Sequence, residues 1–250
     1  MTVQVSYLRT QARHSRRPQP GQPFNLLLVH SVADQLIWQR DEAYYSVWWR
    51  GTWEQECGGV TMGHGIHSID MLAWLLGDPA SLVADAATAK LDIAVEDTSA
   101  ATVRFGNGAV GQIIVTVNAQ DNRSRLEIFG DRLQAVSSES AYDPTSAPFA
   151  LTSLDAAVAD AARESAAQAA PDATKHLHVP MLTDFLDAIE GTRPPLVPVA
   201  ECRRSMELIT GMYKSAMTGE RVTFPIAPDD PFYNQIPPSG FGLAPIQEHA

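Results

Sequence analysis

The chain has 250 residues, of which 45% are hydrophobic and 19% charged, and its formal net charge is −11 at pH 7. This composition is typical of a globular protein with a sizeable core. The acidic balance argues against nucleic acid as a partner, since phosphate binding needs a basic surface, and no apolar run reaches the roughly 18 residues of a membrane helix. Because the only two cysteines, Cys57 and Cys202, indicate no disulfide framework, we expect a cytoplasmic protein.

The N-terminal third predicts strands and loops. Residues Thr2–Leu8 alternate as a strand does, and Arg9–Pro23 is a loop rich in proline and arginine. Phe24–Trp38 is a long β-like stretch, and Gln39–Trp53 follows as an aromatic loop. Apolar side chains then recur every three or four residues, which predicts an amphipathic helix over Thr61–Leu76.

The middle of the chain predicts a meander of strands. From Ser81 to about Val136, segments rich in Val, Ile, Thr and Phe are separated by short turns, which favours antiparallel hairpins. The clearest turn is Gly106-Asn107-Gly108, for which the Asn-Gly pair predicts a type I′ turn.

The C-terminal third predicts helices. Nine alanines fill Ala156–Ala170, which is either a helix or a mobile excursion. Helices are predicted at about His178–Glu190 and about Ala200–Thr218, and a returning strand at Val222–Phe224. The remaining residues, 225–250, form a proline-rich arm draped on this or a neighbouring subunit.

These elements predict the class α+β, with a large open, predominantly antiparallel β-sheet and helices packed on one face. The expected organisation is a single substrate and oligomerisation domain over residues 1–224, followed by the arm. Three helices can cover one face of the sheet only, so we expect the other face to meet a second copy in a homo-oligomer.

Residues 106–111 read Gly-Asn-Gly-Ala-Val-Gly, a literal G-x-G-x-x-G run. That fingerprint binds dinucleotides only where it follows a strand and opens a helix. Here the β-branched segment Gln112–Val117 predicts a strand instead, so we interpret the run as a hairpin.

Polar, titratable side chains gather at the entrance of the predicted helix Thr61–Leu76, and such groups are costly to bury unless they serve a site. His67 and Asp70 are three residues apart and share a helix face, so the carboxylate can fix the tautomer of the imidazole for proton transfer. A core histidine that Asp70 merely satisfies is the alternative.

A metal site is the second alternative for this helix. His64, His67 and Asp70 have metal-binding side chains, but positions i, i+3 and i+6 spread round a helix by more than a third of a turn. Because a zinc site needs three or four converging ligands, we predict that no metal binds here.

The aromatic loop before the helix predicts a carbohydrate site. Trp48, Trp49 and Trp53 offer faces that pack on the C–H faces of sugars and polyols, and Arg50 can bind hydroxyls or a carboxylate. An oligomer interface or a core plug is the alternative, because aromatics are enriched there as well. The pair Gly58-Gly59 predicts a close approach of the backbone to a ligand or another chain.

The segment Tyr44–Gly77, YYSVWWRGTWEQECGGVTMGHGIHSIDMLAWLLG, resembles the substrate-domain core of the Gfo/Idh/MocA oxidoreductases. Val95–Ile113 and Leu182–Val222 are similar to later parts of the same family, in the same order. The resemblance covers about Gln22–Pro225.

This resemblance implies a C-terminal α+β domain that in complete members accompanies an N-terminal Rossmann domain binding NAD or NADP. It implies a sugar, inositol or other polyol as substrate and dimers or tetramers formed through the sheet. By the G-x-H-x-x-D match, it implies that His67 transfers the hydroxyl proton, with Asp70 beside it. The pocket would be lined by Trp48, Trp49, Arg50, Trp53 and His64.

The sequence departs from the family pattern in three places: the nucleotide domain has no counterpart, Gly63 stands where an acidic residue is common, and Cys57 begins the family's glycine triplet. We therefore expect that neither NAD nor NADP binds this chain alone, that the chain is inactive alone, and that a separate Rossmann subunit supplies the cofactor. The alternatives are a non-catalytic sugar-binding or scaffold protein and, less favoured, a metal-dependent hydrolase or isomerase.

Overall fold

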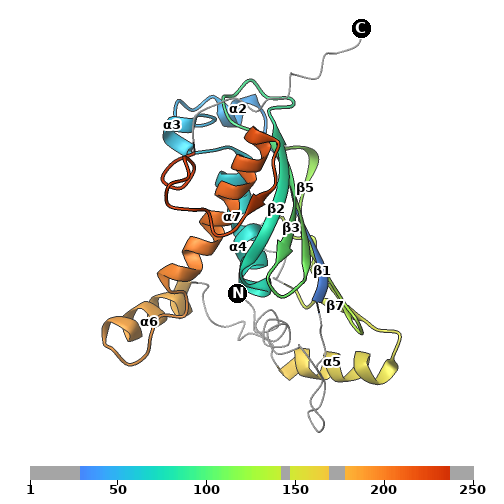
Figure 1. The fold of residues 1–250 in the computed structure, drawn as a ribbon. Helices are drawn as coiled ribbons and strands as arrows, with labels where there is room; N and C mark the ends of the chain where they lie inside the picture. Colours follow the sequence, from blue (N-terminus) through green and yellow to red (C-terminus); the bar gives the residue numbers. More distant parts are fainter. Residues whose placement is uncertain (1–28, 142–146, 169–177, 237–250) are drawn as a thin grey trace.

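A computed structural model describes residues 29–141, 147–168 and 178–236 (Figure 1). The strand expected at Thr2–Leu8, the loop Arg9–Pro23 and the end of the C-terminal arm lie outside the described residues. None of the helices in the described ranges has the length and apolar character needed to cross a bilayer.

An open eight-stranded sheet, in the order β7-β6-β5-β1-β4-β3-β2-β8, is the centre of the fold. Its strands are β1 (Val29–Gln39), β2 (Pro79–Ala87), β3 (Thr98–Phe105), β4 (Val110–Thr116), β5 (Asn118–Gly130), β6 (Gln134–Val136), β7 (Ala150–Thr152) and β8 (Val222–Thr223). Every neighbouring pair is antiparallel except β1 with β4. The predicted open, predominantly antiparallel sheet is therefore confirmed.

The helices are α2 (Glu42–Tyr45), α3 (Trp53–Glu56), α4 (Ile66–Leu76), α5 (Ala156–Gln168), α6 (His178–Ile189) and α7 (Val199–Thr218). A π-helical turn, η1 (Thr61–Gly65), precedes α4 directly, so the predicted helix Thr61–Leu76 is one continuous element with a wider first turn. The alanine-rich segment, for which the sequence left two alternatives, forms the helix α5 within its described residues.

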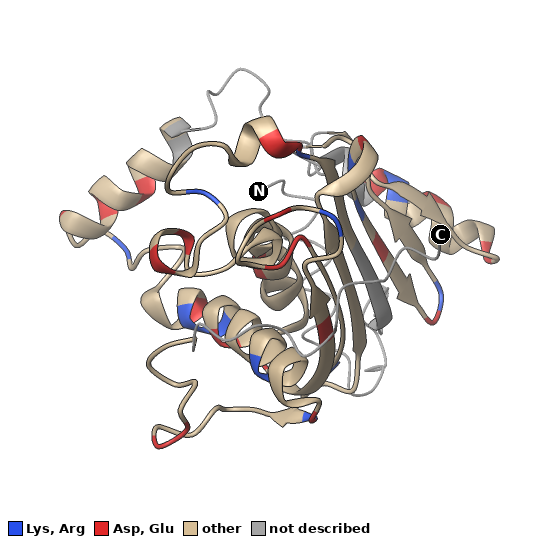
Figure 2. Cartoon of the chain, turned by 90° about the horizontal axis from the view of Figure 1, so that it is seen from above, with Lys and Arg blue, Asp and Glu red and all other residues tan. Residues whose placement is uncertain are grey.

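Helices α4 and α7 pack side by side on one face of the sheet, as Figures 1 and 2 show. Leu72 and Leu75 of α4 meet Leu208 of α7 and the inward side chains of the strands, among them Ile113, in one fully buried core. Buried and exposed residues alternate along β3 without interruption, so its buried side chains face the two helices and its exposed side chains face away from them.

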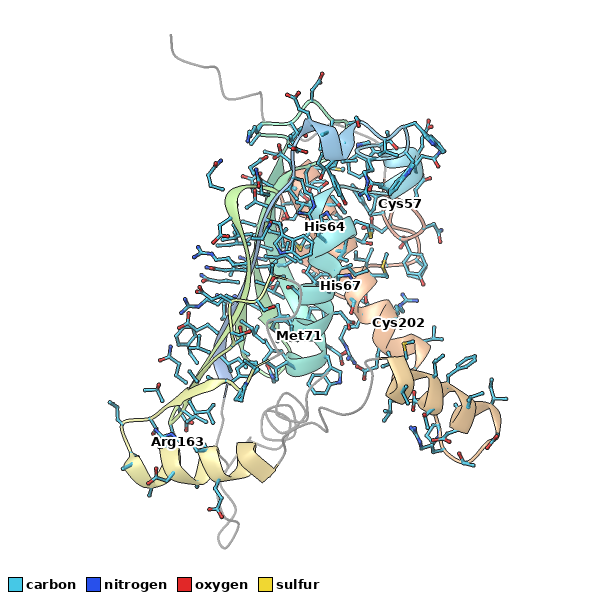
Figure 3. All side chains as sticks on the ribbon, turned by 180° about the vertical axis from the view of Figure 1, so that it is seen from behind. Cys57, His64, His67, Met71, Arg163 and Cys202 are labelled. Carbon is cyan, nitrogen blue, oxygen red and sulfur yellow. The ribbon has the colours of Figure 1, made fainter. Side chains whose placement is uncertain are left out.

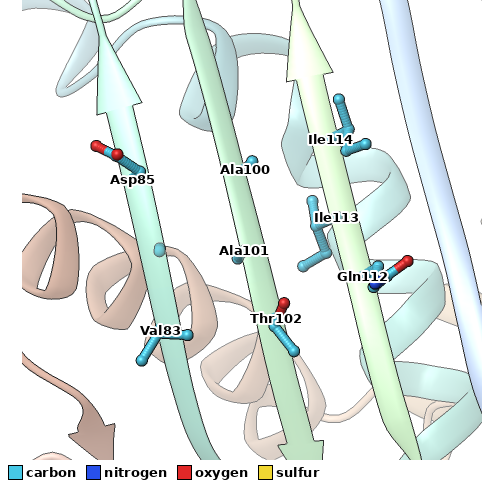
Figure 4. A pocket seen from close by; sticks show the side chains of 9 residues that line it. Val83, Asp85, Ala100, Ala101, Thr102, Gln112, Ile113 and Ile114 are labelled. Atoms are coloured by element: carbon cyan, nitrogen blue, oxygen red, sulfur yellow. The ribbon is translucent and has the colours of Figure 1, made fainter.

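The opposite face of the sheet is uncovered in the described structure (Figure 4). It presents a shallow hollow between β2, β3 and β4. Its outward side chains are small, polar or aliphatic: Val83, Asp85, Ala100, Thr102, Gln112 and Ile114. Helix α6 is also largely uncovered, with Met181, Phe185 and Ile189 each at least 60% exposed.

The run Gly106–Gly111 forms the turn between β3 and β4 and the start of β4, which confirms that it is a hairpin. The predicted type I′ turn is wrong, because only Gly108 has a positive φ, of 93°, and a type I′ turn needs two such residues. Asn107 instead accepts a hydrogen bond from the N–H of Ala109 and donates one to the carbonyl of Leu76, so its side chain, and not a left-handed backbone, shapes the turn.

The described start of the expected arm folds back on its own chain. The N–H of Ile226 donates to Glu207 of α7 over 2.7 Å, and Ile226 is buried. Farther along, the hydroxyl of Tyr233 accepts from Arg203 over 3.1 Å. Residues 225–236 therefore extend the helical layer around α7.

Candidate functional site

A buried carboxylate fixes the start of the histidine-bearing helix. Glu96 is fully buried, and it accepts hydrogen bonds from the N–H groups of Gly59 and Thr61, over 2.9 and 2.8 Å, and from the hydroxyl of Tyr213 over 2.9 Å. Burial outweighs these hydrogen bonds and raises the pKa of Glu96. The carboxyl group occupies the place of a helix cap and holds η1 against α7.

The glycine pair before η1 is required by these same residues. A Cβ on Gly59 would lie 1.8 Å from the carbonyl oxygen of Glu96, and one on Gly58 would lie 2.1 Å from the hydroxyl of Tyr213. The glycine pair was expected to allow a ligand or another chain to approach the backbone closely. That expectation is wrong, because the residues that approach it closely are Glu96 and Tyr213 of the same chain. Sequence analysis missed Glu96, since a carboxylate 35 residues after Thr61 gives no local signal.

His64 lies on η1 and turns toward the sheet. Its ring is 4.9 Å from that of Trp38 in β1, and its Nε2 lies 3.4 Å from the hydroxyl of Tyr44. Burial, together with the charges of Arg40 and Arg50, lowers the pKa of His64 to about 4. The imidazole is therefore neutral at pH 7 and can accept a proton from the hydroxyl of Tyr44 in a hydrogen bond.

Around His64, two guanidinium groups are stacked on aromatic rings. We call this set the arginine–aromatic cluster, and it consists of Trp38, Arg40, Tyr44, Trp49 and Arg50. The Cζ of Arg40 lies 4.9 Å from the Trp38 ring and 5.0 Å from the Tyr44 ring. The Cζ of Arg50 lies 3.8 Å from the Tyr44 ring and 4.2 Å from the Trp49 ring, and Arg50 also donates to the Tyr44 hydroxyl. Such stacking orients the two cations at little entropic cost.

His67 follows on the first turn of α4 and is exposed (Figure 3). Asp70 accepts a hydrogen bond from the hydroxyl of Ser205 on α7, and no hydrogen bond joins Asp70 to His67 in the described ranges. Asp70 therefore ties α4 to α7 in this structure. The catalytic roles of His67 and Asp70 stay predictions.

The remaining site candidates lie in different surroundings. Trp48 is 79% exposed. Trp53 donates from its Nε1 to the carbonyl of Ala94 over 2.9 Å, and its ring meets that of Tyr213 edge to face. The structure thus brings His64, Trp49 and Arg50 together, while Trp53 has a place in the packing around Tyr213. Arg40, which the sequence analysis did not single out, belongs to the same cluster.

The described side chains form neither a metal site nor a dinucleotide fingerprint. Within residues 29–141, 147–168 and 178–236, no three His, Cys, Asp or Glu side chains converge as a metal site requires. The G-x-G-x-x-G run does not fit a dinucleotide either, since it opens strand β4 and offers no helix N-terminus to a pyrophosphate.

Comparisons with known proteins agree with this geometry. Residues 27–136 match the family model described as GFO/IDH/MocA C-terminal domain. Among solved structures, the WlbA dehydrogenase from Bordetella pertussis, in complex with NADH and UDP-GlcNAcA, has a TM-score of 0.68 at 24% identity, over 90% of this chain and 61% of that one. The WlbA dehydrogenase from Chromobacterium violaceum, in the same kind of complex, has a TM-score of 0.69 at 25% identity, over 90% and 61%.

A third similar structure is the aldose-aldose oxidoreductase from Caulobacter crescentus, complexed with glycerol. It has a TM-score of 0.66 at 17% identity, over 89% of this chain and 61% of that one. The comparison with curated protein sequences found no match.

The fold is thus an open-sheet α+β domain of the kind found in oxidoreductases. Specifically, residues 27–136 are similar to the C-terminal domain of the Gfo/Idh/MocA family. The chain spans about three fifths of the length of the solved structures named above.

Proposed function

We propose that this chain is the substrate-binding domain of an NAD(P)-dependent oxidoreductase that acts on a CH–OH group of a sugar, inositol or other polyol. The observation that carries the proposal is the position of His67, three residues after His64, which contacts the arginine–aromatic cluster, in a chain similar to the Gfo/Idh/MocA C-terminal domain. The similar solved structures support it, since they were determined with UDP-GlcNAcA or glycerol bound.

The chemistry proposed for His67 is proton transfer at a substrate hydroxyl oxygen. Its exposed side chain on the first turn of α4 can reach a bound small molecule. A positioned imidazole of this kind typically contributes about 10²–10⁴ in rate. His64 is held neutral by its surroundings, so it serves better as a hydrogen-bond acceptor within the site.

The G-x-G-x-x-G run opens strand β4 and does not fit a dinucleotide, which supports a nicotinamide site on another domain. We propose that a nicotinamide-binding Rossmann subunit supplies NAD or NADP and that the chain alone binds neither. A non-catalytic sugar-binding protein is the second candidate, favoured by Gly63, which places no side chain where the family often has an acid.

Nuclear magnetic resonance on the full chain tests the sugar site. We expect at least one of D-glucose, myo-inositol, D-glucuronate and D-glucose 6-phosphate to shift the Trp49 indole and His67 ring signals in a saturable way. The indole of Trp74, at the far end of α4, is the internal control and should not move. If none of the four compounds moves the Trp49 and His67 signals, the proposed substrate site is wrong.

Two further measurements address the cofactor and the catalysis. A titration with NADH and NADPH, followed by nicotinamide fluorescence, should show no saturable binding to the chain alone; micromolar binding would place the cofactor site in this chain. In an enzyme reconstituted with a nicotinamide-binding subunit, His67→Ala should lower kcat by about 10²–10⁴ with little change in KM. Unchanged turnover would contradict the proposed role of His67, whereas no turnover with any nicotinamide-binding subunit would favour the non-catalytic candidate.

We also propose that residues 1–224 form one domain, followed by the arm 225–250, and that two copies meet through the uncovered sheet face. Val83 and Ile114, 38% and 40% exposed, lie on that face beside small side chains, which suits a flat contact. Light scattering should report a dimer or larger assembly, and Ile114→Lys should dissociate it. The matched variant Leu196→Lys, at an exposed loop position, should leave the assembly intact.

A further inference from the structure

Two positive charges share one aromatic ring at the candidate site. The guanidinium carbons of Arg40 and Arg50 lie 5.0 and 3.8 Å from the centroid of the Tyr44 ring. Like charges held this close repel each other, and the chain as a whole carries a net charge of −11, so the pairing is a local feature and not part of a basic surface.

The charge of Arg50 already has a partner. Its Nη1 lies 3.7 Å from a carboxylate oxygen of Glu56, and that carboxylate also accepts from the N–H of Gly51. Asp41, the acidic residue next to Arg40 in the sequence, is likewise engaged, because it accepts from the N–H of Tyr44 and caps α2.

Arg40 differs from Arg50 in this respect. Its Nη1 donates to the carbonyl of Gln39, but its Nε is buried and has no hydrogen-bond partner. No carboxylate forms an ion pair with Arg40 among the described residues. A buried, unpaired donor on a charged group is costly, and the described residues provide no anionic group for this donor and this positive charge.

The ring of His64 adds no positive charge to the cluster at pH 7. The centroid of the His64 ring lies 4.9 Å from that of Trp38 and 6.0 Å from that of Tyr44, the two rings against which Arg40 is stacked. The imidazole is neutral at pH 7, and the excess charge of the cluster therefore belongs to Arg40.

From this geometry we propose that the arginine–aromatic cluster binds an anionic oxygen group of the substrate, a carboxylate or a phosphoryl group, with Arg40 as its principal ligand. The substrate is then an acidic sugar and not a neutral polyol. This inference rests on the proposed function for the sugar part of the ligand and on the cluster alone for the anion. Guanidinium groups suit both kinds of anion, since their parallel N–H groups match two oxygen atoms.

Calorimetric titration of the full chain with D-glucose, D-glucuronate and D-glucose 6-phosphate tests the specificity. We expect one acidic sugar to bind at least tenfold more tightly than D-glucose, and which acid is preferred distinguishes a carboxylate from a phosphoryl group. Arg40→Gln should remove the preference for the acidic sugar. Arg104→Gln, at an exposed position of β3, is the matched control and should retain the preference.

The sugar-free probes acetate and inorganic phosphate separate this inference from the proposed function. Saturable shifts of the Arg40 Nε–H signal by either anion would support the anion site even where no sugar binds, in which case only the proposed sugar function fails. Equal affinity for D-glucose and both acids would overturn the anion site and leave the sugar site standing. A preference for acid that survives in Arg40→Gln would also overturn the assignment.

Discussion

The hydroxyl of Tyr213 donates a hydrogen bond to the buried carboxyl group of Glu96 over 2.9 Å, across 117 residues of sequence. The same carboxyl oxygen accepts from the N–H of Thr61. Through Glu96, helix α7 therefore determines where η1 begins, and with it the positions of His64 and His67. The scaffold of the candidate site is one hydrogen-bond network between three distant segments.

Removal of the Glu96 side chain should destabilise the protein strongly. Glu96→Ala leaves two N–H groups and the Tyr213 hydroxyl unsatisfied in the core, and we expect a loss of at least about 3 kcal/mol in the free energy of unfolding. Urea denaturation measures it, with Glu190→Ala, at an exposed residue after α6, as the control. A loss no larger than that of the control would contradict the network.

The stability contributed by Glu96 should also depend on pH. Burial raises the pKa of Glu96, so this group binds its proton more tightly in the folded state. Its contribution is complete below the unfolded pKa of about 4.3 and is lost as the pH rises through the folded pKa. The stability of the wild type relative to Glu96→Gln should therefore fall from about pH 4 upward, whereas a difference that grows with pH would contradict the raised pKa.

Substitution by alanine should have opposite effects on stability at Gly59 and Gly63, the two glycines near the start and in the middle of η1. Gly59→Ala places a methyl group against the Glu96 carbonyl and should cost several kcal/mol, or prevent folding, because backbone cannot yield there. A Cβ on Gly63 meets nothing within 4 Å, so Gly63→Ala should be neutral or stabilise by about 0.5–1 kcal/mol. Thermal unfolding of the two variants compares them, and similar melting temperatures would refute the steric argument.

His64 should titrate far below an ordinary histidine. Its pKa of about 4 means that the folded state disfavours the charged imidazole. The corresponding stability is complete above the unfolded pKa of about 6.5 and is lost as the pH falls toward 4, by about 2–3 kcal/mol. The His64 ring signals should show this pKa directly, and Arg40→Gln should raise it. A titration near 6.5 in the wild type would contradict the effect of burial and the two arginines.

The exposed helix α6 should contribute little to the stability of the chain on its own. Phe185 is 62% exposed whereas Leu208 of α7 is fully buried. Phe185→Ser should change the free energy of unfolding by less than about 0.5 kcal/mol, but Leu208→Ala should cost about 2–5 kcal/mol. Denaturant titration compares the pair. A large loss in Phe185→Ser would mean that α6 is covered in solution.

Much of the fold was predictable because its signals are local. The alternation along β3, the spacing of apolar side chains in α4 and the glycine that ends α7 each depend on a few adjacent residues, and the structure confirms all three elements. The turn after β3 was less predictable. The prediction there relied on the backbone preference of Asn-Gly, but the side chain of Asn107 bonds to the end of α4, a tertiary contact without sequence periodicity.

The site was predictable only in part for the same reason. Tryptophans and histidines close together in the sequence indicated a site, and the structure brings His64, Trp49 and Arg50 together. Neither the roles of Glu96 and Tyr213 nor the partner of Asp70 on α7 could be found from residue spacing, since each contact joins segments that only the finished fold brings into register.

The central place of β1 has a consequence for how the chain folds. This strand is made before the other strands of the described sheet, yet it lies between β4 and β5, with Asp34 opposite both Ile113 and Leu126. During synthesis both edges of β1 stay unpaired until those later strands have emerged. Long-range pairing of this kind slows folding and exposes strand edges to other chains, so a newly made chain should depend on chaperones to avoid aggregation more than its finished structure suggests.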